Sequence, residues 1–118
     1  MIHSKNNSEH YIWGNGCDSW ILKDSQNLSI KQEIMPPGTS EKLHFHHHAE
    51  QFFYILKGEA VFYIDGEKFS LKSNESISIL PKSKHYISNE FESDLEFLVI
   101  SNPSSNNDRA LVECKKSN

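Results

Sequence analysis

Residues 38–58 read GTSEKLHFHHHAEQFFYILKG, and four of the chain's seven histidines fall within five positions of this stretch. They are His44, His46, His47 and His48. Residues two apart in an extended segment share a face, so His44 and His46 point the same way, close enough for their imidazoles to chelate one ion. Histidine clusters occur in metal sites and in expression tags, and the internal position of this one favours a metal site.

The second half of the stretch, residues 51–57, alternates between two faces that are both largely apolar. One face carries Gln51, Phe53 and Ile55, and the other carries Phe52, Tyr54 and Leu56. Such a strand is expected to be covered on both sides. One face can line the interior of a barrel, and the other needs the N-terminal strands or a partner subunit, because exposed apolar patches mark interfaces. We therefore predict a homodimer.

The rest of the chain consists of short segments rich in Ile, Leu, Val, Phe and Tyr, separated by turn residues. Apolar Leu28, Ile30 and Ile34, for example, alternate with polar residues. Asp65-Gly66 is a strong hairpin turn. No helix is expected, and the pattern predicts an all-β sandwich or small barrel. The predicted strands are 19–23, 28–35, 43–47, 51–57, 59–64, 67–71, 76–80, 84–89, 95–100 and 110–114.

Length, charge and cysteine content restrict the class of protein. A chain of 118 residues allows one domain, here 1–118. The net charge of −4 argues against a nucleic-acid or anionic-membrane partner. No apolar run is long enough to span a membrane, and the N-terminus has no signal-peptide pattern. Cys17 and Cys114 are expected to be reduced thiols, which predicts a cytoplasmic protein.

Two spaced motifs in the middle of the chain indicate a family. Gly38, His44, His46 and Gly58 have the spacing Gly-x5-His-x-His-x3-4-Glu-x6-Gly, with Gln51 in place of the glutamate. This pattern resembles the first motif of the cupin family. The resemblance implies a double-stranded β-helix, or jelly-roll barrel, with core motifs at 38–89, N-terminal strands within 1–37 and a polar tail at 102–118.

The second cupin motif, Gly-x5-Pro-x-Gly-x2-His-x3-Asn, is matched at His85 and Asn89. Asn74 occupies the position of the first glycine, a mild change because asparagine tolerates the left-handed region. Leu80 and Lys82 replace the proline and the second glycine, and Pro81 is shifted by one position.

The resemblance implies a metal centre whose ligands are His44, His46, Gln51 and His85. Glu50 is the alternative to Gln51 as the fourth ligand, because the motif also allows only three residues after His46. Gln51 alone keeps the six-residue spacing to Gly58. Three imidazoles and an amide suit a divalent transition metal: Fe, Mn, Ni, Zn, Cu or Co. Phe53 and Ile55, on the face of Gln51, are expected to line a pocket beside it.

A cupin fold hosts many chemistries, so the sequence leaves the function open. The first reading is a metal-dependent enzyme acting on a small organic substrate, dioxygenase-like or lyase-like. Alternatives are an isomerase or epimerase of a sugar or keto acid and a non-catalytic binding module. No general base is evident, because the alternation places Tyr54 outward and only an inward Tyr63 could serve. This absence favours chemistry at the metal itself.

Overall fold

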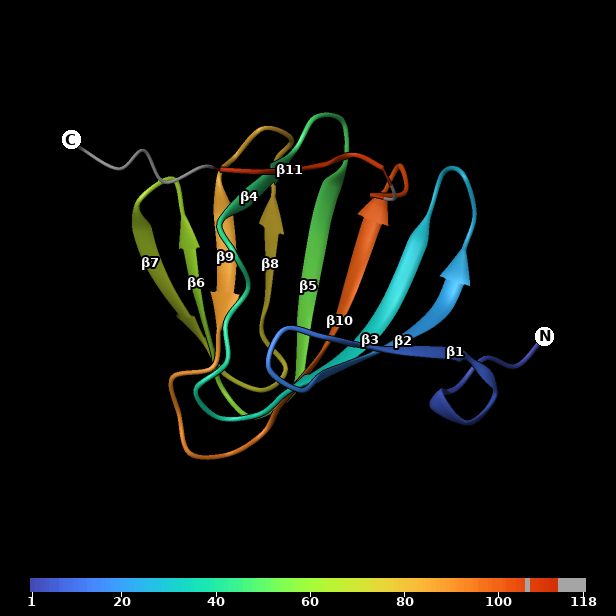
Figure 1. The fold of residues 1–118 in the computed structure, drawn as a ribbon, viewed down its shortest axis with the longest axis horizontal. Coiled ribbons are helices and arrows are strands. Elements are labelled where there is room, and N and C mark those ends of the chain that lie inside the picture. The colour runs from blue at the N-terminus through green and yellow to red at the C-terminus, as the bar shows by residue number, and fades with distance from the viewer. Residues whose placement is uncertain (106, 113–118) are drawn as a thin grey trace.

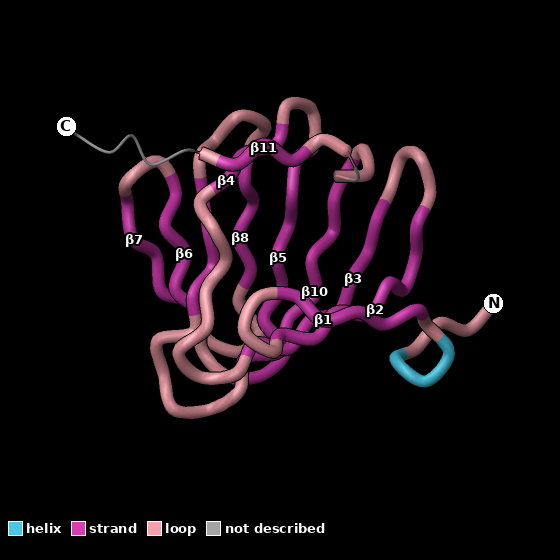
Figure 2. Tube along the Cα trace, in the orientation of Figure 1, coloured by secondary structure: helices cyan, strands magenta, loops and turns pink. Residues whose placement is uncertain are grey.

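Two antiparallel β-sheets face each other and enclose an apolar core (Figure 1). The computed structural model describes residues 1–105 and 107–112. Within this part, a single 3-10 turn at Lys5–Asn7 is the only helical segment (Figure 2), so no helix is long and apolar enough to cross a bilayer. The strands are β1 (Glu9–Trp13), β2 (Cys17–Asp24), β3 (Ser29–Met35), β4 (His44–His46), β5 (Glu50–Lys57), β6 (Ala60–Ile64), β7 (Glu67–Leu71), β8 (Ser76–Ile79), β9 (His85–Ser88), β10 (Leu95–Asn102) and β11 (Arg109–Leu111).

The strand order confirms the predicted double-stranded β-helix. One sheet has the order β1-β2-β3-β10-β5-β8, and the other has β11-β4-β9-β6-β7. The chain passes from sheet to sheet as it winds, so neighbours in space are often distant in sequence. The core between the sheets is apolar and includes Met35, Phe53, Ile55, Phe62, Ile79, Ile87, Leu95 and Phe97.

Each predicted strand range overlaps one of the strands β2–β11. The Asp65-Gly66 hairpin is confirmed, since both residues have the positive φ that a tight β6–β7 turn needs. The last predicted strand, 110–114, runs beyond the described residues, and Cys114 lies outside them. β1 was not among the predicted ranges. Its side chains are mostly exposed, so it has no apolar alternation, and its pairing with β2 holds it in place.

The two faces of β5 differ in burial. Phe53 and Ile55 on the inner face are buried, whereas Phe52 and Leu56 on the outer face are each 38% exposed. The N-terminal strands do not cover this outer face, because β1 and β2 extend the same sheet at its other edge. No described residue was found to supply the expected cover from within the chain, and the homodimer stays a prediction.

Asn89, the last residue of the second motif, joins the end of β3 to the loop that follows β9. Its buried side chain donates from Nδ2 to the carbonyls of Met35 (2.8 Å) and Ser93 (2.9 Å) and accepts at Oδ1 from the amide of Phe91 (3.1 Å). Asn89→Ala is expected to destabilise the fold by about 3 kcal/mol, because it leaves buried backbone groups unpaired. This corresponds to a Tm loss of roughly 10 °C. Calorimetry checks it, with exposed Asn27→Ala as control, and equal Tm values for the two variants would contradict it.

Candidate metal centre

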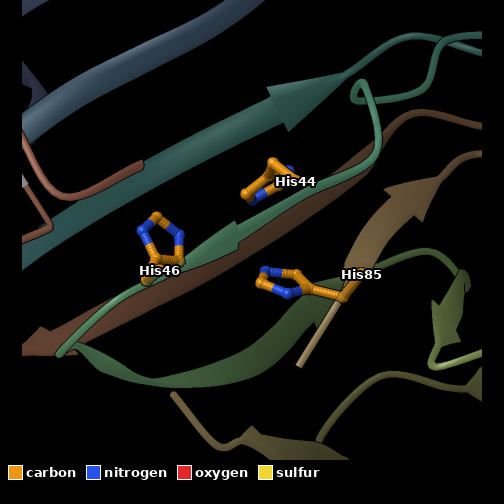
Figure 3. Close-up of side chains that lie close together, drawn as sticks. All are labelled: His44, His46 and His85. Carbon is orange, nitrogen blue, oxygen red and sulfur yellow. The ribbon is translucent and has the colours of Figure 1, made fainter. Parts of the chain in front are cut away.

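Three histidine side chains converge between the sheets (Figure 3). His44 and His46 lie on β4, and His85 lies on β9 directly opposite His44 in the strand register. The ring centroids are 4.3 Å (His44–His85), 5.2 Å (His44–His46) and 5.7 Å (His46–His85) apart. One ring nitrogen from each lies within 4.8 Å of the others, and all three residues are buried.

Backbone carbonyls fix the tautomers of two of these rings. The Nδ1–H of His44 donates to the carbonyl of Lys42 (2.7 Å), and the Nδ1–H of His85 donates to that of Ser83 (2.9 Å). In both cases the acceptor is two residues earlier in the chain. Each Nε2 therefore keeps its lone pair. Orientation of this kind is typical of metal-binding histidines, whose second nitrogen usually donates to a carbonyl or carboxylate.

His46 has a different environment, because neither of its ring nitrogens has a hydrogen-bond partner among the described residues. The residue is only 4% exposed. Buried polar groups in proteins are nearly always paired, so an imidazole without a partner needs an explanation. A bound ion on one nitrogen would provide it, and this observation fits a metal site.

Gln51, rather than Glu50, faces the three histidines. The Gln51 side chain is buried, donates from Nε2 to Ser101 Oγ (3.0 Å) and places Oε1 3.2 Å from His85 Nε2. Glu50 is exposed. With the amide in this orientation, two lone pairs face each other across 3.2 Å, which is unfavourable unless a cation lies between them. Three imidazoles and an amide oxygen thus form a donor set that fits a divalent transition metal.

The histidines are held in the neutral form that a metal requires. Burial, followed by the neighbouring His85, lowers the pKa of His44 to about 3 and that of His46 to about 4. Burial also lowers the pKa of His85. Their lone pairs are therefore not blocked by protons at neutral pH.

A cavity of about 140 Å³ opens beside the cluster. Its wall includes His44, His46, Gln51 and Phe53. Ile55, two residues further along β5, is fully buried in the apolar core and is not part of this wall.

The cavity also contains charged and polar residues that the sequence reasoning missed. On β3 the polar side of the alternation turns inward, so Ser29 and Glu33 are buried while Ile30 and Ile34 are only half-buried. The sequence pattern of this strand predicted the opposite orientation, since the apolar face of a strand ordinarily packs inward. The residues that the structure adds to the wall are Tyr11, Trp13, Lys31, Glu33, Glu41, Val99, Ser101, Ser105 and Arg109.

The two tyrosines considered as bases lie elsewhere. The Tyr54 hydroxyl is 3.3 Å from Asn74 Oδ1, and the Tyr63 hydroxyl donates to Glu90 (2.7 Å) at the surface. The hydrogen bond to Glu90 raises the pKa of Tyr63 to about 12. Neither lines the cavity. Glu33 and Glu41 are the carboxyl groups that line the cavity instead.

The fold and the site define a small β-barrel with a candidate metal centre, and comparison with known proteins agrees. The cupin domain family model matches residues 31–101, and the chain belongs to this family. It is 37% identical over 75 residues to an uncharacterized protein of Methanocaldococcus jannaschii, a match spanning 64% of this chain and 60% of the relative. It is 36% identical over 66 residues to the oxalate-binding protein of Thermotoga maritima, spanning 56% and 54%. The chain thus spans little more than half the length of these relatives.

Solved structures share the fold. A predicted oxalate decarboxylase of Thermotoga maritima superposes with a TM-score of 0.81 at 23% identity, covering 88% of this chain and all of that one. A sugar phosphate isomerase from a cupin superfamily of Silicibacter pomeroyi has a TM-score of 0.77 at 17% identity, covering 88% and 76%. At these identities the likeness establishes the fold alone.

The shifted pKa values predict how the metal-free protein responds to acid. In the unfolded chain His44 and His46 become protonated as the pH falls below about 6.5, whereas in the folded protein they stay neutral until about pH 3 and pH 4. The unfolded state therefore binds more protons in this range, and the stability of the fold decreases as the pH falls. Glu41 acts in the opposite direction. Its pKa is raised from 4.5 to about 7, so it contributes stability at low pH that is lost as pH rises through about 7.

Glu41→Gln removes this opposing contribution. Between pH 5 and 6.5 the loss of stability on acidification is therefore expected to become steeper, by up to about 1.4 kcal/mol per pH unit. Urea unfolding at several pH values measures this slope. An unchanged or shallower slope in the variant would show that Glu41 titrates normally.

Proposed function

We propose that this protein is a metal-dependent enzyme that binds a small organic acid beside a centre formed by His44, His46, Gln51 and His85. The observation that carries the proposal is His46, a buried imidazole whose two nitrogens have no partner among the described residues, next to two rings of fixed tautomer. A divalent transition metal held by these residues would supply positive charge that polarises a carbonyl or carboxyl oxygen of the ligand.

The cavity wall supports an anionic ligand. Arg109 and Lys31 bring positive charge, and the Nε1–H of Trp13 is a buried donor without a partner among the described residues. A cavity of about 150 Å³ holds a ligand of benzene size, so about six non-hydrogen atoms fit here. The Thermotoga relative, named for binding oxalate, supports a ligand of this size and charge.

Substitution with cobalt tests this proposal. The visible spectrum of the Co²⁺-loaded protein is expected to change on addition of oxalate or pyruvate, because an open metal position would accept a ligand oxygen. His48→Ala is the matched control, since His48 belongs to the same histidine run but is exposed. Failure of the wild type to bind cobalt stoichiometrically, or a spectrum unaffected by either acid, would refute the proposal.

A second candidate is a binding module without turnover, which the name of the Thermotoga relative favours. The two functions differ in the fate of the ligand. A binding module returns it unchanged after prolonged incubation, whereas an enzyme converts it or exchanges its hydrogens with solvent. NMR of the recovered acid distinguishes them.

We also propose that the outer face of β5 pairs with a second copy of the chain. The support is the exposure of Phe52 and Leu56 on a sheet face that the chain leaves open. Light scattering is expected to show a dimer that Leu56→Glu dissociates. A monomeric wild type at working concentration would contradict this.

A further inference from the structure

The cavity contains two carboxyl groups that metal binding does not use. Glu33 is on β3, and Glu41 lies in the segment that leads into β4. Both belong to the same wall as His44 and His46. Paired carboxyl groups with different protonation states are a common acid–base device in enzymes.

Each glutamate is held by defined contacts. Glu41 accepts the amide N–H of Ile87 at Oε1 (3.1 Å), which fixes one oxygen and leaves the other available. Glu33 is 8% exposed and stands opposite Ser19 in the β2–β3 register, and the nearby Ser19 hydroxyl only partly offsets the rise that burial causes in the pKa of Glu33. The two carboxyl groups therefore have unlike surroundings: one has a backbone donor, and the other has a side-chain hydroxyl.

We propose that Glu41 and Glu33 are the acid and base of this cavity, which move a proton to and from a small carboxylic acid that carries a neighbouring ketone. The inference rests on the proposed function above and specifies its reaction class. It replaces the dioxygenase-like reading, which depended on the absence of a base.

The proton transfer is balanced without any other reactant. The ionised carboxylate takes a proton from the carbon next to the ketone. The electron pair of that C–H bond forms a C=C bond, and the former C=O pair moves onto the oxygen as an enolate. Return of a proton from the carboxylic acid restores the ketone. In D₂O the net change is exchange of hydrogen for deuterium at that carbon.

The surroundings disfavour a negative charge on both carboxyl groups at once near neutral pH. Burial, then the charge of Glu33, raises the pKa of Glu41 to about 7, and burial raises that of Glu33. The positive charges that act on the pair are Lys31, on the same strand as Glu33, and Arg109 on β11. Cys17 adds no charge, because burial raises the pKa of its thiol. Tyr11, His44 and His46 complete the titratable groups of this wall.

The test measures deuterium exchange at C3 of pyruvate and of 2-oxobutyrate by ¹H NMR, using metal-loaded protein. Glu41→Gln and Glu33→Gln are each expected to slow the exchange by more than about 100-fold, the range of general acid–base catalysis. Glu41→Asp, which keeps the carboxyl group, is expected to recover part of the rate. Glu92→Gln, in an exposed loop, is the matched control and is expected to exchange like the wild type.

A second readout does not depend on turnover. In metal-free protein with ¹³C-labelled glutamate, one carboxyl resonance is expected to titrate near neutral pH and to be absent from Glu41→Gln.

The outcomes separate this inference from the proposed function. Metal-loaded wild type that exchanges neither acid, a Glu41→Gln variant that exchanges within about threefold of wild type, or the absence of a carboxyl group titrating near neutral pH would overturn the acid–base inference alone. Failure of the wild type to bind metal would instead overturn the proposed function.

Discussion

His85→Ala is expected to lower the affinity of the protein for Co²⁺ or Zn²⁺ by more than about 100-fold. Loss of an outer partner of a metal ligand already reduces affinity by about 10–100-fold, and His85 is proposed to bind the ion directly. The ring is buried, lies 4.3 Å from that of His44, and faces the Gln51 amide oxygen with its Nε2. No other described side chain was found to replace this nitrogen. Isothermal titration calorimetry and elemental analysis of untagged protein measure the effect.

Two variants make the result specific. His48→Ala removes an imidazole from the same HHH run, but from an exposed position, and is expected to bind metal like the wild type. Gln51→Glu keeps an oxygen ligand and adds a charge, so it is expected to bind at least as tightly. If His85→Ala retained stoichiometric metal with wild-type affinity, the three-histidine centre would be disproved.

Gly58→Ala is expected to destabilise the fold by about 2–5 kcal/mol. Gly58 has φ of +85°, and a Cβ at this position would lie 2.5 Å from the backbone carbonyl oxygen of Asp94. The left-handed conformation costs an alanine about 1–2 kcal/mol, and overpacking against backbone adds about 1–3 kcal/mol. The β9–β10 loop would have to move for the methyl group to fit. Equilibrium urea unfolding measures the loss.

Gly66→Ala is the matched control. Gly66 has nearly the same φ, +86°, but a Cβ there meets no atom within 4 Å. Gly66→Ala is therefore expected to lose only the stability that the left-handed backbone conformation costs an alanine, about 1–2 kcal/mol. The difference between the stability losses of the two variants measures the cost of placing a methyl group against the backbone of Asp94. Equal losses would mean that the loop moves freely and that Gly58 is required only for its φ.

The two spaced motifs predicted the barrel because they encode backbone conformation as well as side-chain chemistry. Asn74 and Lys82 replace motif glycines, and both have positive φ, +69° and +71°. The turns are thus retained although the residues differ. At position 82 the backbone amide also donates to the carbonyl of His46 (2.7 Å), which ties this turn to the histidine strand. A lysine in this conformation is uncommon, so residue type alone gave no sign of it.

The charged residues of the cavity wall could not be predicted from the sequence, because their position depends on contacts between distant segments. Glu33 faces the cavity only because β3 pairs with β2 and β10 in one particular register. Arg109 reaches the site because β11 pairs with β4, so that its Nη2 lies 3.3 Å from His44 Nδ1. The identity of a residue states its chemistry, but the strand pairing decides which face it occupies. The two motifs therefore revealed the three histidines and Gln51, whereas Glu33 and Arg109 required the structure.

The carbonyls of Lys42 and Ser83 have a consequence for the rate of metal uptake. They hold the rings of His44 and His85 in place while the chain is still empty of metal, so binding requires neither a proton shift nor a rotation of these side chains. If the centre binds metal as proposed, the entering ion would meet side chains whose ordering entropy was already lost when the barrel folded. Association would then be limited by the exchange of water from the ion itself. Ions that shed water slowly, such as Ni²⁺, should load more slowly than Zn²⁺ even where their final affinities are equal.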